Sequence, residues 1–404
     1  MGQQLDHARE LDARYVMHTY GDRSPVLFAR GEGVHLYDDE GTEYLDFLAG
    51  IAVCPLGHAD PAVTKAVQEQ AGKILQLSNY FHEEHRGEVA AELSRIAGGD
   101  EYGWKAFFGN SGAEANECAM KVARRWGQLH KGPQCQTIVT LLGSFHGRTM
   151  ETLAATAQGW LQDPFAPLPG GFKAVPRNDV AALEAAVTPD VCAIMMEPIQ
   201  GESGVWPMSD EYLMAVRRIA DERGCLVIFD EVQTGLYRCG KPLCFQTVEA
   251  AGPNGVVPDI VTLAKGIASG IPCGVCLARG EAADTLQPGQ QGSTFGGGPV
   301  AMAAAQATLG ELARRELDAQ AAEMGTYLTA RLAEVPYVTE VRGKGLMVGA
   351  TIEGHDAHDI VSTLLLEHHI VANACNDTVL RLLPPLTIGR ADVDELIEAL
   401  KSLA

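Results

Sequence analysis

From about residue 104, short apolar runs alternate with amphipathic segments along the chain. Leu226–Phe229 and Ile260–Leu263 are apolar at successive positions and end abruptly in polar or small residues, as buried parallel strands do. Between such runs, Ser209 precedes a segment in which Tyr212 and Val216 lie on one apolar helical face. Further strands are predicted at Lys105–Phe108, Ile138–Leu142, Cys192–Met196 and Gly274–Ala278. This alternation predicts a doubly wound α/β domain with a mainly parallel sheet.

Shorter and more mixed elements towards both ends of the chain predict a second, smaller α+β domain. Val34–Asp38 and Glu43–Phe47 flank a turn and predict a hairpin. A helical pattern covers residues 300–334, and a last helix is predicted to begin at Asp392. The predicted bounds are residues 1–60 for an N-terminal segment that joins the small domain, 61–295 for the large α/β domain and 296–404 for the small domain.

Composition and charge exclude several classes of partner. The 404 residues are 46% hydrophobic and 21% charged, which is ordinary for a folded soluble protein. The formal net charge of −21 argues against nucleic acid or an anionic membrane surface as a partner. The N-terminus carries Asp6, Arg9 and Glu10 instead of an apolar signal core, and no apolar run approaches the ~20 residues of a membrane helix. We therefore expect a cytoplasmic protein.

Two groups of possible metal ligands are not expected to bind a metal. Cys273 and Cys276 form a CxxC, but the pair lies inside the apolar run IPCGVCLA and has no second pair, so we interpret it as core. His82 and His85 are one residue too close for HExxH, so they do not share a helix face at i and i+4. The ten cysteines are expected to be thiols in a reducing compartment.

Each of the two central apolar runs is followed by a charged residue. Leu226–Phe229 ends in Asp230, and Ile260–Leu263 is followed by Ala264 and Lys265. Open parallel sheets bind ligands at the carboxyl ends of their strands, so both charges could face one pocket. Pyridoxal phosphate (PLP) needs this pair, because a lysine binds it covalently and an acid pairs with its ring nitrogen. A surface lysine and a helix-capping aspartate are the alternative, because charged residues are usually solvated.

Two further segments carry chemistry that suits such a cofactor. GNSGAEANE joins a strand to a helix, and Ser111, Gly112 and Ala113 would let backbone N–H groups approach a phosphate at the helix N-terminus. An ordinary tight turn is the alternative interpretation of that loop. In FHGRT, the ring of Phe145 can stack on a planar ring and Arg148 can clamp a carboxylate.

A buried cation is predicted near the C-terminus. Arg381 lies in VLRLLPPL, where an apolar run surrounds the charge. A buried arginine needs a fixed acid or an anionic ligand as its partner. Glu202, in the glycine-rich loop QGESGV, could be that partner when no ligand is bound.

Together these motifs resemble the class III aminotransferases, which belong to the PLP fold type I superfamily. The resemblance extends from about Tyr20 to Leu386 and is carried by YLDFLAGIAV, GNSGAEANE, FHGRT, EPIQGESGV, DEVQTG, LAKG, GSTFGG and RLLPPL. Within the class, AGIAV and RLLPPLTI resemble the acetylornithine aminotransferases of arginine biosynthesis. Ile51 stands where ornithine aminotransferases tend to carry a tyrosine that contacts the free amine. The resemblance implies a large doubly wound, mainly parallel sheet domain and a smaller α+β domain.

The resemblance also implies a role for each matching residue. Lys265 would be the catalytic residue, binding PLP and moving the substrate proton, and Asp230 would pair with the ring nitrogen. The other cofactor-binding residues would be Ser111, Gly112, Ala113, Phe145, Val232, Gln233 and Thr294. Thr294 would come from the second subunit of a homodimer. The substrate-binding residues would be Arg148, Glu202, Ser293 and Arg381, with Glu202 pairing with Arg381 while the amine donor is bound.

The implied reaction transfers the terminal amine of N2-acetylornithine to 2-oxoglutarate. Succinylornithine, succinyl-diaminopimelate, ornithine and 4-aminobutyrate are alternative donors, and an aminomutase or a non-catalytic binding protein are alternative functions on the same fold. The chain departs from the class at Gly298, where Asn is common before Pro299, and in LYRCGK, where GRTGK is common. These departures remove none of the expected chemical groups.

Overall fold

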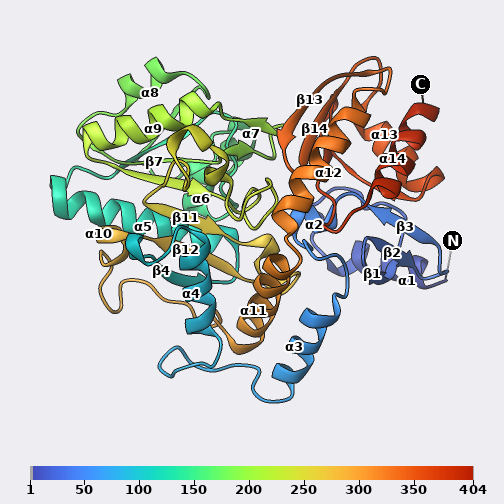
Figure 1. Ribbon diagram of the computed structural model, residues 1–404, viewed down its shortest axis with the longest axis horizontal. Helices are drawn as coiled ribbons and strands as arrows, with labels where there is room; N and C mark the ends of the chain where they lie inside the picture. Colours follow the sequence, from blue (N-terminus) through green and yellow to red (C-terminus); the bar gives the residue numbers. More distant parts are fainter. Residues whose placement is uncertain (1–2, 404) are drawn as a thin grey trace.

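The computed structural model describes residues 3–403 and is built around a seven-stranded sheet (Figure 1). The strand order is β4-β12-β11-β10-β7-β5-β6, and β12 runs antiparallel to both of its neighbours while the other paired neighbours are parallel. The strands are β4 (Lys105–Gly109), β5 (Thr137–Leu141), β6 (Phe172–Val175), β7 (Val191–Met196), β10 (Leu226–Asp230), β11 (Ile260–Leu263) and β12 (Gly274–Ala278). The predicted large, mainly parallel sheet is confirmed.

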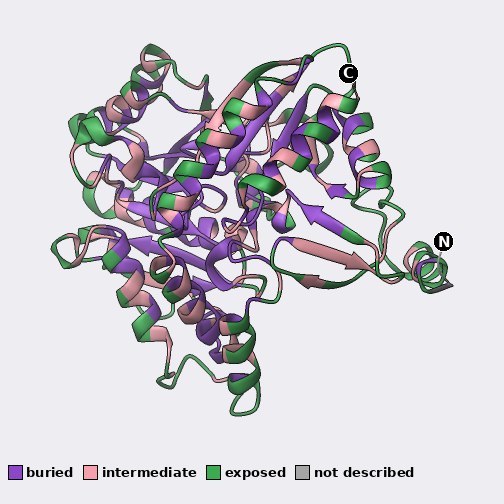
Figure 2. Cartoon of the chain, turned by 45° about the vertical axis from the view of Figure 1, so that its right-hand side comes forward, coloured by how far each residue is buried: buried purple, intermediate pink, exposed green. Residues whose placement is uncertain are grey.

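Helices cover both faces of this sheet, which explains its continuous apolar strands. On β10, Ile228 packs in a buried cluster with side chains of α5 (Gly112–Lys131), and its neighbour Phe229 packs in the cluster that contains side chains of α9 (Asp210–Arg223). Successive residues of a strand point to opposite faces, so both must be apolar when both faces are covered. The central strands are accordingly buried along their whole length (Figure 2).

The N-terminal and C-terminal parts of the chain together form a second structural unit (Figure 1). β15 (Ile370–Val371) pairs in parallel with β3 (Glu43–Asp46), so a C-terminal strand completes the N-terminal sheet β1-β2-β3-β15. The predicted hairpin is confirmed, because β2 and β3 are antiparallel. The remaining strands here are β1 (Phe28–Glu32), β2 (His35–Asp38), β13 (Val338–Lys344), β14 (Met347–Ile352), β16 (Asn373–Asn376) and β17 (Val379–Leu382), the last four forming the sheet β13-β14-β17-β16. The exact domain bounds stay a prediction.

The predicted helix over residues 300–334 is two helices. α11 (Pro299–Arg314) ends where Arg315 and Glu316 leave the helix, and α12 (Leu317–Leu332) follows. Glu316 has a φ of +51°, in the left-handed region that interrupts a right-handed helix. The apolar periodicity resumes beyond this break, so the pattern alone gave no sign of it.

The last helix begins before the predicted residue. α14 (Arg390–Ser402) has Gly389 as its N-cap. Asp392 lies three residues inside, and its carboxylate accepts a hydrogen bond from the Gly389 amide at 2.8 Å. In a capping box, the side chain of the third helical residue accepts the backbone amide of the N-cap residue. An acid in this position is therefore easily confused with the N-cap itself.

The other elements are short or peripheral. They are α1 (Gln3–Tyr15), α2 (Ala49–Ala52), α3 (Pro61–Ala71), α4 (Arg86–Ile96), α6 (Met150–Ala155), α7 (Gly159–Gln162), α8 (Val180–Ala186), α10 (Gly280–Ala283), α13 (Ala357–Glu367), β8 (Ile199–Gln200), β9 (Trp206–Pro207) and the 3₁₀ turns η1 (Asp100–Tyr102), η2 (Asp163–Phe165), η3 (Cys244–Thr247), η4 (Glu249–Ala251) and η5 (Lys265–Ala268). Within residues 3–403, no helix combines the length and apolar character needed to cross a membrane.

Candidate active site

A cavity of about 430 Å³ lies at the carboxyl edge of the large sheet. The ends of β10 and β11 bring Asp230 and Lys265 to the same cavity, as the two charged strand ends predicted. The predicted residues that line it are Ser111, Gly112, Ala113, Phe145, Arg148, Asp230, Val232, Gln233 and Lys265. Motifs from four separate parts of the sequence therefore converge on one pocket.

Lys265 is half-buried and has a strained backbone conformation. It begins the turn η5 directly after β11, and its φ of +45° lies in the left-handed region, which is uncommon for a side-chain-bearing residue. Burial lowers the pKa of Lys265 from 10.5 to about 8; Arg381 also lowers it, and Glu202 opposes both. A substantial fraction of this amine is therefore neutral near physiological pH, which a nucleophilic or basic lysine requires.

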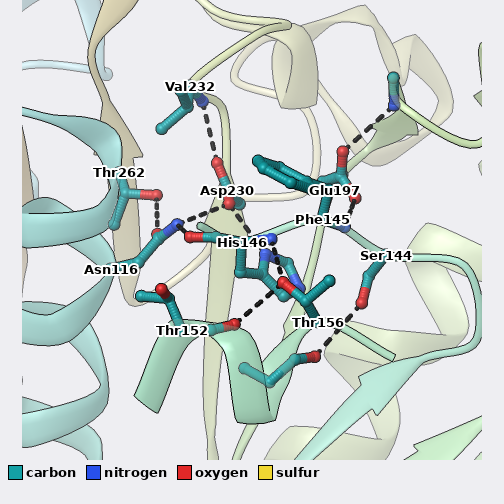
Figure 3. Close-up of polar contacts among 12 residues, drawn as sticks. Asn116, Ser144, Phe145, His146, Thr152, Thr156, Glu197, Asp230, Val232 and Thr262 are labelled. Atoms are coloured by element: carbon teal, nitrogen blue, oxygen red, sulfur yellow. Dashed lines mark hydrogen bonds and ion pairs between the residues drawn. The ribbon is translucent and has the colours of Figure 1, made fainter. Parts of the chain in front are cut away.

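Asp230 is fixed by three hydrogen bonds inside the cavity wall (Figure 3). Its Oδ2 accepts from Asn116 Nδ2 and pairs with His146 Nδ1, both at 2.8 Å, and its Oδ1 accepts from the Val232 amide at 3.0 Å. Glu231, the next residue, turns away and accepts the backbone amides that begin η3. In the DEVQTG segment, Asp230 therefore lines the pocket, and Glu231 holds the loop that begins η3.

Sequence analysis missed the residues behind Asp230. His146 has a fully buried side chain, and its backbone amide donates to Thr156 Oγ1 at 2.9 Å. Asn116 is oriented in turn, because its Oδ1 accepts from Thr262 Oγ1 at 2.7 Å (Figure 3). His146 and Asn116 lie inside FHGRT and GNSGAEANE, so the motifs located them, but no sequence rule indicated that they face Asp230.

Glu197 is a second acid that sequence analysis did not assign to the site. It lines the cavity after β7 and accepts from the Phe145 amide at 2.8 Å and the Gly201 amide at 3.1 Å. Burial raises the pKa of Glu197 to about 7, with Asp230 raising it further and His146 opposing. This carboxyl ties the loop of Phe145 to the loop that carries Glu202.

The N-terminus of α5 opens into the cavity. Ser111 is its N-cap and accepts the Glu114 amide on Oγ at 3.2 Å, while Gly112 and Ala113 begin the helix. The amides of the first turn have no partners within the helix, and the helix dipole favours an anion there. A Cβ on Gly112 would lie 2.8 Å from Val232 Cγ1, so glycine is needed for this close approach.

An ion pair between the buried Arg381 and the half-buried Glu202 lies beside the cavity. Arg381 Nη1 donates to Glu202 Oε1 at 2.7 Å, and Gln233 Nε2 donates to the same oxygen at 3.1 Å. Asn373 Oδ1 accepts the other side of the guanidinium at 2.8 and 3.1 Å. Burial raises the pKa of Glu202, but the charge and hydrogen bond of Arg381 outweigh burial and keep that pKa below its usual value. The buried arginine thus has the partner that the sequence suggested.

Comparison with known proteins decides the family. The sequence model described as Aminotransferase class-III matches residues 16–403. The chain belongs to the class III aminotransferases. An acetylornithine aminotransferase from Caldanaerobacter subterraneus subsp. tengcongensis is 43% identical over 393 residues, which cover 96% of this chain and 97% of the relative.

Solved structures agree with this assignment. The crystal structure of ornithine aminotransferase from Toxoplasma gondii ME49 matches this class III aminotransferase with a TM-score of 0.91 and 31% identity, covering 99% of this chain and 95% of that chain. Acetylornithine aminotransferase from Elizabethkingia anophelis matches with a TM-score of 0.85 and 31% identity, covering 98% of each chain. The fold is therefore PLP fold type I.

Aminotransferases of this class depend on PLP, and the cavity of this class III aminotransferase fits that cofactor. The first-turn amides at Gly112 suit a phosphate, the Asp230 carboxylate suits a protonated ring nitrogen, and the amine of Lys265, with its lowered pKa, suits a covalent link. Phe145 lines the same wall and offers a ring for stacking, with the Arg148 guanidinium 5.6 Å from its centroid.

Four of the predicted residues do not line this pocket. Glu202 and Arg381 form the ion pair beside it, and Ser293 and Thr294 are also absent from the described residues that line it. Ser293 Oγ accepts from Asn110 Nδ2 at 3.2 Å, which places it next to a lining residue. Thr294 is exposed, and its carbonyl accepts from Gln76 Nε2 at 2.7 Å. Their roles toward cofactor and substrate stay predictions.

Proposed function

We propose that this aminotransferase moves the terminal amine of N2-acetyl-L-ornithine to 2-oxoglutarate, giving N-acetyl-L-glutamate 5-semialdehyde and L-glutamate. The relatives from Caldanaerobacter and Elizabethkingia support this donor, because both are named acetylornithine aminotransferase. The reaction would serve arginine biosynthesis, and we expect it to take place in the cytoplasm.

Each residue of the cavity has a separate role in the proposed reaction. When bound, PLP supplies an electron-withdrawing ring and carries the amino group between donor and acceptor. Nζ of Lys265 is the base that removes the proton from the carbon bearing the substrate amine and later returns it. Asp230 would keep the ring nitrogen protonated, and Gln233 would hold the ring hydroxyl. Ser111, Gly112, Ala113 and Thr294 would hold the phosphate, and Phe145 and Val232 would enclose the ring.

The observation that carries the proposal is the Glu202–Arg381 pair beside the cavity. A single pocket must accept a donor whose reacting carbon bears no carboxylate and an acceptor whose reacting carbon bears one in addition to its distal carboxylate. Arg381 paired with Glu202 presents no net charge to the donor, and Arg381 released from Glu202 binds the extra carboxylate of 2-oxoglutarate. Arg148 would bind the other substrate carboxylate, with Ser293 beside it.

The environment of Ile51 favours an acylated donor. Ile51 packs against a buried apolar cluster that includes Val205 and Met347, and isoleucine itself offers no polar group to a free amine. An apolar wall tolerates an acetyl group, whereas a charged ammonium would lose solvation without compensation.

A homodimer with shared active sites is part of the proposal. Tyr80 and Phe295 are 94% and 66% exposed, and the loops that carry them are joined because Asn79 Nδ2 donates to Ser293 O at 2.8 Å. Exposed apolar side chains gathered on joined loops mark an association surface. Thr294 lies on this surface, from which it would reach the phosphate of the other subunit. Sedimentation of the purified protein should give the mass of two chains, and a fully active monomer would contradict the shared site.

Substrate specificity is tested by comparing donors at fixed 2-oxoglutarate. Purified holoenzyme is assayed for glutamate formation with N2-acetylornithine, N2-succinylornithine, N-succinyl-diaminopimelate, ornithine and 4-aminobutyrate. We expect kcat/KM for N2-acetylornithine to exceed that for ornithine about tenfold or more. Equal values for the two donors would overturn the assignment of the donor. Turnover of an amine without any 2-oxoglutarate would instead indicate an aminomutase.

A further inference from the structure

One row of residues across the C-terminal sheet faces the loop that carries Glu202. In the pairing of β13, β14 and β17, Arg342 lies opposite Gly349, and Gly349 lies opposite Arg381. Residues that lie directly opposite each other on neighbouring strands point to the same face of the sheet. The row therefore places two arginines on one face with a glycine between them, and Arg381 is the arginine that pairs with Glu202.

The loop between β8 and β9, residues 201–205, packs against the middle of this row. A Cβ on Gly349 would lie 2.8 Å from Val205 Cβ and 3.2 Å from the carbonyl oxygen of Gly204. Val205 is fully buried and has a φ of +56°, in the left-handed region that a β-branched residue rarely adopts. Such a conformation persists only where surrounding contacts hold it. The loop therefore depends on the sheet for its shape, and it needs a glycine at this position of β14.

Arg342 fixes the same loop from the other end of the row. Its Nε donates to the carbonyl oxygen of Gly204 at 2.9 Å, and its guanidinium carbon lies 3.7 Å from the centroid of the Trp206 ring. Its Nη1 is oriented by Glu340 Oε2 at 3.0 Å and by Thr351 Oγ1 at 2.6 Å. The Arg342 side chain is only 7% exposed. A hydrogen bond from a charged donor in such surroundings holds the loop more firmly than a neutral donor would.

The two arginines contact different groups of loop 201–205. Arg342 contacts the backbone at Gly204, and Arg381 contacts the carboxylate of Glu202 at 2.7 Å. In the proposed reaction only the second contact breaks, when a carboxylate of 2-oxoglutarate replaces Glu202. The first contact restricts the motion of the loop, so less conformational entropy is lost when Glu202 pairs with Arg381. A carboxylate held in this way competes with the substrate more strongly than a carboxylate on a free loop.

We propose that Arg342 and Gly349 are positioning residues that hold Glu202 against Arg381 and thereby set the balance between binding of the amine donor and binding of the dicarboxylate acceptor. The inference rests on the proposed function, in which Glu202 and the acceptor compete for Arg381. Neither Arg342 nor Gly349 is among the described residues that line the cavity, so both act through loop 201–205.

The first test follows the loop without any substrate, so its result is independent of the proposed transaminase reaction. Amide hydrogen exchange of the holoenzyme is measured by mass spectrometry on the peptide that covers residues 201–206. Arg342→Gln removes the charged donor to Gly204, and Gly349→Ala introduces a Cβ 2.8 Å from Val205. In both variants this peptide should exchange about tenfold faster than in the wild type, because the loop opens more often.

Arg177→Gln is the matched control. Arg177 also contacts the Trp206 ring, with its guanidinium carbon 4.6 Å from the ring centroid. Within residues 3–403 no hydrogen bond joins the Arg177 side chain to loop 201–205, whereas Arg342 makes one. This control should match the wild type in every measurement, which separates the hydrogen bond to the loop from contact with the tryptophan.

The second test measures the consequence for substrate binding, with the donor and acceptor half-reactions followed separately by stopped-flow absorbance. In Arg342→Gln and in Gly349→Ala, the Kd for 2-oxoglutarate should fall about threefold to tenfold and the donor half-reaction should slow. In a Glu202→Gln background neither substitution should lower this Kd further, because the carboxylate that they position is absent. The measurement with 2-oxoglutarate uses no amine donor, so an error in the proposed donor leaves it unaffected.

Three results would overturn the proposal. They are an unchanged exchange rate of the loop in both variants, an equal weakening of both half-reactions, and the same change in the Kd for 2-oxoglutarate with and without the Glu202 carboxylate. Arg342→Lys keeps a cation that can donate to Gly204 and should lie between the wild type and Arg342→Gln in both tests. Should Arg342→Gln fail to fold, Arg342→Lys and Gly349→Ala still decide the question.

Discussion

Replacement of Glu202 by glutamine should separate the two half-reactions. Glutamine keeps the size of the side chain and can still accept a hydrogen bond, but it removes the charge that Arg381 faces at 2.7 Å. In the wild type, a carboxylate of 2-oxoglutarate must displace Glu202 from Arg381 before it binds. In Glu202→Gln this competition disappears, so the acceptor should bind more tightly.

The size of the effect follows from the geometry of the pair. A hydrogen bond between charged groups contributes about 1.5–3 kcal/mol net. The Arg381 side chain is 2% exposed but that of Glu202 is 30% exposed, so solvent screens the pair toward about 1–2 kcal/mol. This range corresponds to a Kd for 2-oxoglutarate about fivefold to thirtyfold lower in the variant. The donor half-reaction should slow, because an unpaired Arg381 attracts the donor carboxylate away from Arg148.

Stopped-flow absorbance of each half-reaction, with donor alone and with acceptor alone, measures the two effects separately. Glu211→Gln is the matched control, because it removes an exposed acid in the first turn of α9, outside the cavity. Both half-reactions of that control should equal the wild type. The reasoning is refuted if Glu202→Gln leaves the affinity for 2-oxoglutarate unchanged, or if both half-reactions weaken equally.

Three further predictions concern single residues. Lys265→Ala should abolish turnover while the fold remains, because the cavity then lacks its base; near-normal turnover would rule out the proposed mechanism. Gly112→Ala places a Cβ 2.8 Å from Val232, so PLP titrated into the variant apoenzyme should bind about tenfold more weakly, and unchanged affinity would show that the loop adapts freely. The pKa of His58, which its hydrogen bond to Asp46 raises from 6.5 to about 9, gives stability that is fully present below pH 6.5 and lost as pH rises through 9, up to about 3 kcal/mol. Urea unfolding between these pH values should show this loss in the wild type and little of it in Asp46→Asn; parallel pH profiles would contradict the pairing.

The strands and the pocket followed from sequence because their physical causes are local. Continuous apolar runs require burial on both faces, and a charge at the end of such a run has only the strand edge to occupy. Asp230 and Lys265 were therefore predictable from the pattern itself. The Glu202–Arg381 contact was suggested by the general need of a buried arginine for an acid.

The groups that support the site were not predictable in the same way. His146 and Asn116 contact Asp230 only because a loop, a helix and a strand end from separate parts of the chain converge, and nothing in their own sequence neighbourhood indicates which side chain they meet. The break at Glu316 depends on a single backbone angle within an uninterrupted apolar pattern.

The visible absorption spectrum of the purified holoenzyme, recorded before and after addition of N2-acetylornithine alone, is the decisive measurement for the proposed donor and for the role of Lys265. Ornithine at the same concentration is the control. We expect the cofactor's visible band to disappear with N2-acetylornithine and to change little with ornithine. Equal loss of the band with both donors would contradict the proposed donor. A protein that shows no visible band even after incubation with PLP would contradict the role given to Lys265.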